Sequence, residues 1–306
     1  MEYRITKEHD GKLLRRFLEQ DLRLSSKMIR HIKFLESGMT VNGEHVTVRC
    51  VLREGDLLCL ATEDTETAAI APVDLPIEIL YEDSDIVVPA KPADMPTHPS
   101  HDHYDDTVAN ALAYRYAKSG KPFVFRPVNR LDRNTSGLLL IARNRTAAGR
   151  LSEAMKGGRI EKTYLAVLDG ELPLGDGAID ACLHRTEESI ILREVCASDA
   201  PDAAPSRTKY RVLAAENGHS LVEAHPITGR THQLRVHFAY IGHPITGDDL
   251  YGSPSPFIAR HALHARTLQF PHPTTEKILQ FTAPLAHDFS TLVYKLFPIF
   301  TERNPL

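Results

Sequence analysis

The sequence predicts an α+β protein whose larger part is built around a mixed, largely antiparallel sheet, preceded by a small α+β module. From residue 76 onward, strand-like runs alternate with shorter helical runs, without the regular strand–helix alternation of a parallel sheet. The chain also has no G-x-G-x-x-G or P-loop pattern. A doubly wound nucleotide-binding fold is therefore not expected.

The composition is that of a globular protein with room for about two domains. The 306 residues are 42% hydrophobic and 25% charged, which is not the composition of a disordered chain. The formal net charge of -4 argues against a protein that holds nucleic acid by bulk charge. Between residues 12 and 33, however, seven Lys or Arg residues accompany only two acidic ones, so this end is locally basic.

The cysteines and the apolar runs favour a cytoplasmic protein. The four cysteines form no C-x-x-C pair, so free thiols in a reducing compartment are expected. The polar first ten residues do not resemble a signal peptide, and no apolar run approaches the ~20 residues of a membrane span. We expect no membrane association, and a monomer is the default oligomeric state.

Residues 1–62 are expected to form the small module. Apolar residues at helical spacing predict a helix around residues 13–18 and a second one that begins at Ser25, an N-cap residue, and ends at Gly38. The second helix presents Lys27, Arg30 and His31 on the face opposite its apolar residues. Asn42-Gly43 predicts a hairpin turn between strands at 39–41 and 45–48, and a further strand is expected at 57–61.

Residues 63–75 are small and acidic and lack periodicity, which is typical of a linker, and residues 76–306 are expected to form the larger domain. In that domain helices are expected at 107–117 and 147–155, and a third one carries Leu234, Phe238 and Ile241 on one face and ends at Gly242. The expected strands cover 77–81, 86–88, 137–142, 163–167 and 208–213.

The run from Arg126 to Ile141 is the most informative stretch. It reads as a polar loop followed by a buried apolar strand, with Asp132 flanked by Arg130 and Arg133. Neighbouring cations and hydrogen bonds keep a carboxylate ionised, and an ionised aspartate held out of bulk water is a usable nucleophile. A surface turn capped by Asp132 is the structural alternative.

This run resembles the second motif of the RluA-type pseudouridine synthases, usually written His-Arg-Leu-Asp-x-x-Thr-Ser-Gly. Asn129 stands where the histidine is usual, and the other positions match: Arg130, Leu131, Asp132, Thr135, Ser136 and Gly137. The resemblance implies that Asp132 is the catalytic residue and that the matching neighbours contact the substrate. The segments around Ile79–Asp83, Lys91-Pro92 and Met95–Pro99 are similar to the first motif of the same family.

Two further motifs follow in the family's order. Lys162-Thr163-Tyr164 matches the Lys-x-Tyr motif, which implies that Tyr164 stacks on a flipped-out base, with a possible part in proton transfer, and that Lys162 lies near the substrate. The run Gly229–Arg235 resembles the Gly-Arg-x-His-Gln-(Ile/Leu)-Arg motif. It implies that Arg235 pairs with the aspartate, that Arg230 contacts a phosphate or a loop, and that Leu234 packs on the base. The motif adds His232 and Gln233 to the expected substrate-binding residues.

The first 60 residues resemble the S-four-type RNA-binding module, named after a ribosomal small-subunit protein. The resemblance rests on the basic helix, the hairpin at Asn42-Gly43 and the turn at Gly55-Asp56. It implies that Lys27 and Arg30 contact RNA phosphates, since a helix with one cationic face can position RNA without reading its sequence.

These resemblances together imply an enzyme that isomerises uridine to pseudouridine in structured RNA without a cofactor. Large-subunit ribosomal RNA is favoured as the substrate, and transfer RNA is the alternative. A non-catalytic RNA-binding or ribosome-assembly protein and a hydrolase that uses Asp132 are the readings from other classes. The histidine groups 98–103 and 261–264 could suggest zinc, but no second ligand set has metal-site spacing. We expect no metal and interpret these histidines as exposed loop residues that meet RNA.

Overall fold

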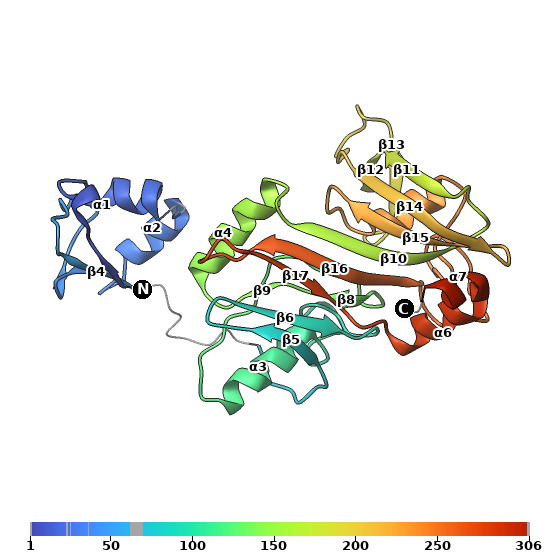
Figure 1. The fold of residues 1–306 in the computed structure, drawn as a ribbon, viewed down its shortest axis with the longest axis horizontal. Coiled ribbons are helices and arrows are strands. Elements are labelled where there is room, and N and C mark those ends of the chain that lie inside the picture. The colour runs from blue at the N-terminus through green and yellow to red at the C-terminus, as the bar shows by residue number, and fades with distance from the viewer. Residues whose placement is uncertain (1, 23, 25, 36, 62–69, 305–306) are drawn as a thin grey trace.

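The computed structural model describes residues 2–22, 24, 26–35, 37–61 and 70–304 (Figure 1). The expected N-cap Ser25, the side chains of Lys27 and His31, and part of the expected linker lie outside the described residues. In the part that is described, no helix is both long enough and apolar enough to cross a membrane.

The N-terminal residues fold around a core of their own. The buried apolar residues of this core all come from between Ile5 and Leu60. Among the described residues, the strands of the module form one antiparallel sheet in the order β1-β4-β2-β3. The elements are β1 (Glu2–Arg4), η1 (Lys7–His9), α1 (Leu14–Arg16), η2 (Phe17–Asp21), α2 (Ser26–Lys33), β2 (Met39–Val41), β3 (Glu44–His45) and β4 (Leu57–Leu60).

The hairpin of the module is shorter than the sequence predicts. Asn42 and Gly43 both have positive φ, as a tight two-residue turn requires. The second strand ends at His45 rather than at Val48, because the chain turns away there through a hydrogen bond from the Cys50 amide to the Thr47 carbonyl.

The larger domain is built on one mixed sheet, which confirms the expected fold class. In the described part of the chain its strands follow the order β11-β14-β15-β10-β16-β8-β6-β9-β7, with β17 beside β16 and β5 beside β6. The β16–β8 pairing is parallel, and the other pairings of this sheet among the described residues are antiparallel. The strands are β5 (Glu78–Glu82), β6 (Ile86–Lys91), β7 (Arg126–Pro127), β8 (Ser136–Leu138), β9 (Ile141–Ala142), β10 (Glu161–Asp169), β11 (Gly175–Asp180), β14 (Arg207–Glu216), β15 (His219–Pro226), β16 (Leu263–Pro271) and β17 (Ile278–Thr282).

Apolar residues cover both faces of this sheet. In β6, Val87 belongs to one buried cluster, whereas Ile86 and Val88 belong to another, as the alternation of side chains along a strand requires. Helices α3 (Val108–Lys118) and α6 (His287–Leu296) contribute to the first cluster, and α4 (Arg145–Lys156) contributes to the second. The remaining helices are α5 (Gln233–Tyr240) and α7 (Pro298–Arg303).

The expected strand at 137–142 is divided into β8 and β9. The Leu139 amide still donates to the Pro89 carbonyl of β6, but the Leu140 amide donates to the Asn129 side chain at 2.7 Å, and the ladder is interrupted there. Asn129 also donates to the Leu138 carbonyl at 3.3 Å. The asparagine that stands where the family usually has a histidine therefore supports the backbone between the two strands.

A separate hairpin, β12 (Cys182–Arg185) with β13 (Arg193–Cys196), stands next to β11 and β14 in the upper part of Figure 1. Its turn exposes Ile190 and Ile191. No motif or periodic pattern of the sequence predicted this hairpin.

Candidate active site

A cleft with a volume of about 870 Å³ crosses the larger domain beside Asp132. Its walls include the loop before β8, the start of β10 and the loop that leads into α5, together with residues at the end of α4. The first three segments carry the Asp132 motif, the Lys-x-Tyr motif and the Gly229–Arg235 motif. Most of the expected site residues line it, namely Arg130, Leu131, Asp132, Thr135, Lys162, Tyr164, Arg230, His232, Gln233, Leu234 and Arg235.

The loop that carries Asp132 is held by buried polar groups on both sides. Thr97 donates its hydroxyl to the Leu131 carbonyl at 2.9 Å and accepts from the Leu131 amide at 3.2 Å. The Thr135 hydroxyl lies 2.8 Å from Nε2 of His261, and the Thr135 amide donates to the Asp132 carbonyl. These contacts fix the backbone on each side of the carboxylate.

Lys91 also stabilises the loop that carries Asp132. Its ammonium group is buried and donates to the carbonyl oxygens of Pro92, Met95 and Arg133 at 2.8–2.9 Å. Burial lowers the pKa of Lys91 to about 7, although three carbonyl partners favour its charged form. The lysine of the Lys-Pro pair in the first motif therefore has a structural role, which was not predicted from the sequence.

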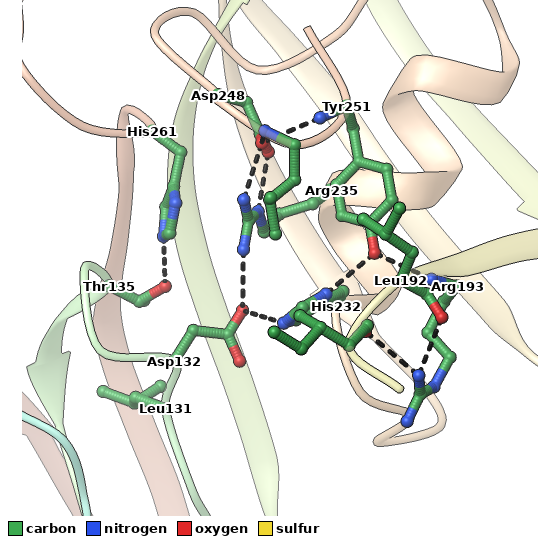
Figure 2. A network of polar contacts seen from close by, with 12 residues as sticks. Leu131, Asp132, Thr135, Leu192, Arg193, His232, Arg235, Asp248, Tyr251 and His261 are labelled. Carbon is green, nitrogen blue, oxygen red and sulfur yellow. Dashed lines mark hydrogen bonds and ion pairs between the residues drawn. The ribbon is translucent and has the colours of Figure 1, made fainter. Parts of the chain in front are cut away.

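The carboxylate of Asp132 faces two side chains from the segment that begins α5 (Figure 2). Nη1 of Arg235 lies 3.8 Å from Oδ2 of Asp132, and Nε2 of His232 lies 3.9 Å from the same oxygen. Both groups attract the carboxylate, and neither contact is short enough to be a hydrogen bond. Asp132 keeps about a fifth of its side chain exposed to the cleft.

Arg235 is bound more closely to a residue that the sequence analysis did not select. Asp248 holds it with both oxygens, at 2.6 Å from Nε and 2.6 Å from Nη2, and the Asp248 carboxylate is completely buried. Burial alone would raise the pKa of Asp248, but the hydrogen bonds from Arg235 outweigh it and lower that pKa. The expected pairing of Arg235 with Asp132 is thus the longer of two contacts. The Gly247-Asp248 pair downstream of the motif was the sequence feature from which this partner of Arg235 could have been predicted.

Tyr164 lies in β10 and lines the cleft with its ring. Burial raises the pKa of Tyr164, and the nearby Asp132 carboxylate raises it further. The phenol is therefore neutral at physiological pH. Lys162, two residues earlier, also lines the cleft, and burial lowers the pKa of its ammonium group.

Two residues of the Gly229–Arg235 motif, Arg230 and Gln233, differ in their roles. Arg230 is exposed and donates from Nε to the Pro205 carbonyl at 3.3 Å. Gln233 is buried, and its side chain joins Thr228 and the Arg230 amide to the Arg207 carbonyl. Gln233 consequently braces the loop, so most of its hydrogen-bonding capacity is already used.

Ser136 and Gly137 are not among the residues that line the cleft, and their expected part in substrate binding stays a prediction. The Ser136 hydroxyl is buried against Nδ1 of His264 and against Arg260. Gly137 has a φ of 113°, and a Cβ there would lie 2.2 Å from the Ala265 carbonyl oxygen. Both residues are required by the close approach of β8 to β16.

The interpretation of the later histidines as exposed is also wrong. His261 and His264 are each 2% exposed, and each belongs to the packing of the loop before β8 or of β8 itself. Burial lowers the pKa of His261 and of His264 to about 3. Among the residues that the structure describes, no group of three or more His, Cys, Asp or Glu side chains is placed to hold a metal ion.

Comparison with known proteins gives a consistent answer. The sequence profile described as RNA pseudouridylate synthase matches residues 85–240. The uncharacterized RNA pseudouridine synthase YjbO of Bacillus subtilis is 40% identical over 276 residues, which cover 89% of this chain and 95% of that protein. The ribosomal large subunit pseudouridine synthase D of Vibrio parahaemolyticus is 34% identical over 86% of this chain and 84% of its own.

A solved structure extends the comparison to the fold. The human RNA pseudouridylate synthase domain containing 1 aligns with a TM-score of 0.57 and 31% identity, over 72% of this chain and 86% of that one. The profile covers the loop of Asp132, strand β10 and the arginine motif, so it includes the walls of the cleft. The chain therefore belongs to the RNA pseudouridine synthase family, the isomerases that convert uridine in RNA to pseudouridine.

Proposed function

We propose that this chain converts uridine to pseudouridine in large-subunit ribosomal RNA and that Asp132 is its catalytic carboxylate. Relatives named for the large ribosomal subunit in Vibrio parahaemolyticus and Yersinia pestis, each 34% identical to this chain, support the substrate. The observation that carries the catalytic role is the position of Asp132 in the cleft, partly exposed, opposite Arg235 and His232.

The reaction breaks the N1–C1′ glycosidic bond, turns the uracil and joins C5 to C1′. The hydrogen on C5 leaves as a proton and N1 gains one, so the sum is an isomerisation that needs no redox cofactor. Asp132 attacks the nucleoside or assists the cleavage of its glycosidic bond. The guanidinium of Arg235 stabilises negative charge on that carboxylate by Coulomb attraction over 3.8 Å.

The target base must leave its stack to reach Asp132, because the carboxylate lies inside the cleft. Tyr164 and Leu234 line this space and offer an aromatic and an aliphatic surface for the uracil. A buried, neutral phenol suits stacking and hydrogen-bond donation better than removal of the C5 proton, since its pKa is raised.

Cationic side chains in the cleft wall fit the phosphates on either side of the flipped nucleotide. Arg130, Lys162 and Arg230 all line the cleft, and each can donate a hydrogen bond to a phosphate oxygen. Residues 1–62 act as an S-four-like RNA-binding module, in which the exposed Arg30 on α2 contacts the backbone of the RNA. The catalytic domain comprises residues 76–306.

The position of His232 also fits a second candidate, a hydrolase that uses Asp132. A histidine next to the carboxylate is what such an enzyme would present, and Nε2 of His232 lies 3.9 Å from it. Family membership favours the isomerase. The two activities give different products, because hydrolysis of the glycosidic bond releases free uracil whereas isomerisation keeps the base on the chain.

Tritium release from RNA labelled with 5-³H-uridine tests the proposal. Total ribosomal RNA and transfer RNA are supplied separately, and the Asp132→Ala protein is measured beside the wild type. We expect tritium in water, no free uracil, and signal from ribosomal RNA with the wild type alone. Tritium release only from transfer RNA would show that transfer RNA, and not ribosomal RNA, is the substrate. Free uracil would support the hydrolase. Bound RNA without tritium release from a folded wild type would point to a non-catalytic RNA-binding protein.

A further inference from the structure

The left-handed start of helix α5 places His232 between Asp132 and Tyr251. His232 has a φ of 56°, and its Nδ1 lies 2.8 Å from the Tyr251 hydroxyl. The two rings meet edge to face with their centroids 5.6 Å apart. The imidazole thus contacts Tyr251 with one nitrogen and faces the Asp132 carboxylate with the other (Figure 2).

A backbone amide favours one direction for the hydrogen bond between Tyr251 and His232. The Arg193 amide donates to the Tyr251 hydroxyl oxygen at 3.0 Å. Since an amide N–H can only donate, the phenol oxygen accepts there, and donation of its own proton to Nδ1 of His232 then uses both its acceptor and its donor capacity. Nδ1 of His232 is then the acceptor, so a neutral imidazole must carry its proton on Nε2. Burial lowers the pKa of His232, which keeps the ring neutral at pH 7.

We propose that Tyr251 holds His232 in the Nε2–H tautomer and so directs a hydrogen-bond donor at Oδ2 of Asp132. His232 and Tyr251 are then positioning residues for the reaction, and this rests on the proposed catalytic role of Asp132. Arg235 approaches the same oxygen with Nη1 at 3.8 Å. With both donors on Oδ2, the other oxygen of the carboxylate is left to meet the substrate.

The two contacts to Oδ2 are longer than hydrogen bonds by about 1 Å. Hydrogen bonds of active sites are often long before the substrate is bound and tighten in the complex. A small movement of the carboxylate toward His232 and Arg235 would complete both bonds together.

The same network joins the β12–β13 hairpin to the site. The Arg193 guanidinium donates from Nη1 to the carbonyls of Ile190, Ile191 and Leu192, at 3.4, 3.0 and 2.7 Å. One residue therefore shapes the turn of the hairpin with its side chain and orients Tyr251 with its backbone. A displacement of the hairpin is expected to reach Asp132 through Tyr251 and His232.

The tautomer can be observed directly in the full chain. We would label the histidines with ¹⁵N, record two-bond ¹H–¹⁵N correlations at pH 7, and assign His232 from the signal that is lost in His232→Gln. We expect an unprotonated Nδ1 and a protonated Nε2 in the wild type. Tyr251→Phe, which lacks the donor, should raise the share of the other tautomer. A proton on Nδ1 in the wild type, or an unchanged ring in Tyr251→Phe, would overturn the proposal.

The kinetic test uses release of tritium from 5-³H-uridine RNA. Tyr251→Phe should lower kcat at least tenfold, about 1.4 kcal/mol, with KM and the melting temperature unchanged. Tyr240→Phe, a change to an exposed tyrosine of α5, is the matched control and should behave as the wild type. His232→Gln offers an amide N–H near the position of Nε2 and should retain more activity than His232→Ala.

The outcomes separate this inference from the proposed function. Wild-type kcat in Tyr251→Phe, or equal loss in His232→Gln and His232→Ala, would contradict the inference while the role of Asp132 stood. Tritium release by Asp132→Ala would instead remove the proposed function. The tautomer measurement needs no activity, so it decides whether Tyr251 controls His232 in either case.

Discussion

Asp248 is the residue that fixes the orientation of the Arg235 guanidinium group in the candidate site. It is fully buried, and it holds two of the three guanidinium nitrogens of Arg235, which leaves Nη1 to face Asp132. A buried charge whose partner is removed is strongly destabilising, because the desolvation cost remains and the attraction is lost. Asp248 thus stabilises the domain and aims the arginine at the same time.

We expect Asp248→Asn to lower the free energy of unfolding by about 3–5 kcal/mol and to reduce kcat more than it raises KM. Urea unfolding and tritium release would measure the two effects. Asp249→Asn is the matched control, because Asp249 lies 3.3 Å from Arg235 but is largely exposed. Its change should cost less than about 1 kcal/mol. Equal behaviour of the two variants would contradict the assigned role of Asp248.

Among the elements, the short parallel contact between β8 and β16 joins the loop that carries Asp132 to the middle of the sheet. Gly137 allows it, since its φ is 113° and its missing Cβ leaves room for the backbone of Ala265. Ser136 and Thr135, on the same segment, use their hydroxyls to bind His264 and His261. Ser136 and Gly137, at the end of the motif, therefore serve packing, whereas Leu131, Asp132 and Thr135 line the cleft.

Gly137→Ala tests this division. We expect it to lower the free energy of unfolding by roughly 2–4 kcal/mol, from overpacking and from a backbone conformation that alanine rarely adopts. Gly149→Ala, in the middle of α4 with open space around it, should instead be neutral or stabilise by up to about 1 kcal/mol. Thermal unfolding of the two variants would measure the contrast, and a stable Gly137→Ala protein would contradict it.

Helix α2 carries a separate prediction for RNA binding. Arg30→Ala should raise KM several-fold and leave kcat unchanged, because Arg30 lies on the module rather than in the cleft. It should also reduce the slope of log affinity against log salt concentration by about one unit. Lys118→Ala on α3, another exposed cation near a helix end, is the control. An unchanged KM and salt slope would remove Arg30 from the RNA interface.

At the scale of the whole molecule, buried histidines make stability depend on pH. His264 is buried on β16 next to β8, and its folded-state pKa of about 3 is far below its ordinary value of 6.5. Between these values the unfolded chain binds a proton that the folded chain excludes, so stability falls as the pH decreases from 6.5 towards 3. His261 adds a dependence of the same sign.

His264→Gln should weaken this dependence. We expect the variant to lose some stability at pH 7, where the hydrogen bond with Ser136 is disturbed, but to lose less than the wild type between pH 7 and pH 4.5. Urea unfolding at the two pH values would show a smaller difference in the free energy of unfolding for the variant than for the wild type. His101→Gln, a change at an exposed histidine, should follow the wild type. A steeper acid loss in His264→Gln would contradict the assignment.

Much of the architecture could be predicted from local patterns. The α+β class and its largely antiparallel sheet followed from the period of the apolar residues, and α3 lies within one residue of the expected helix. The shorter β3 and the divided β8 and β9 were not predicted. In each case the strand ends where a hydrogen bond to a distant residue or to a turn replaces the ladder, and such bonds leave no periodic signal.

The candidate reacting groups Asp132, Tyr164 and Arg235 could be named from the sequence, because each matches a position in a motif of the family that the chain resembles. How these groups are held depends on the folded chain. The Asp248 clamp, the approach of His232 to Asp132, and the link through Tyr251 to the β12–β13 hairpin join segments that are far apart in sequence. The physical reason is that hydrogen-bond direction and charge pairing depend on distances in space, which residue order does not contain.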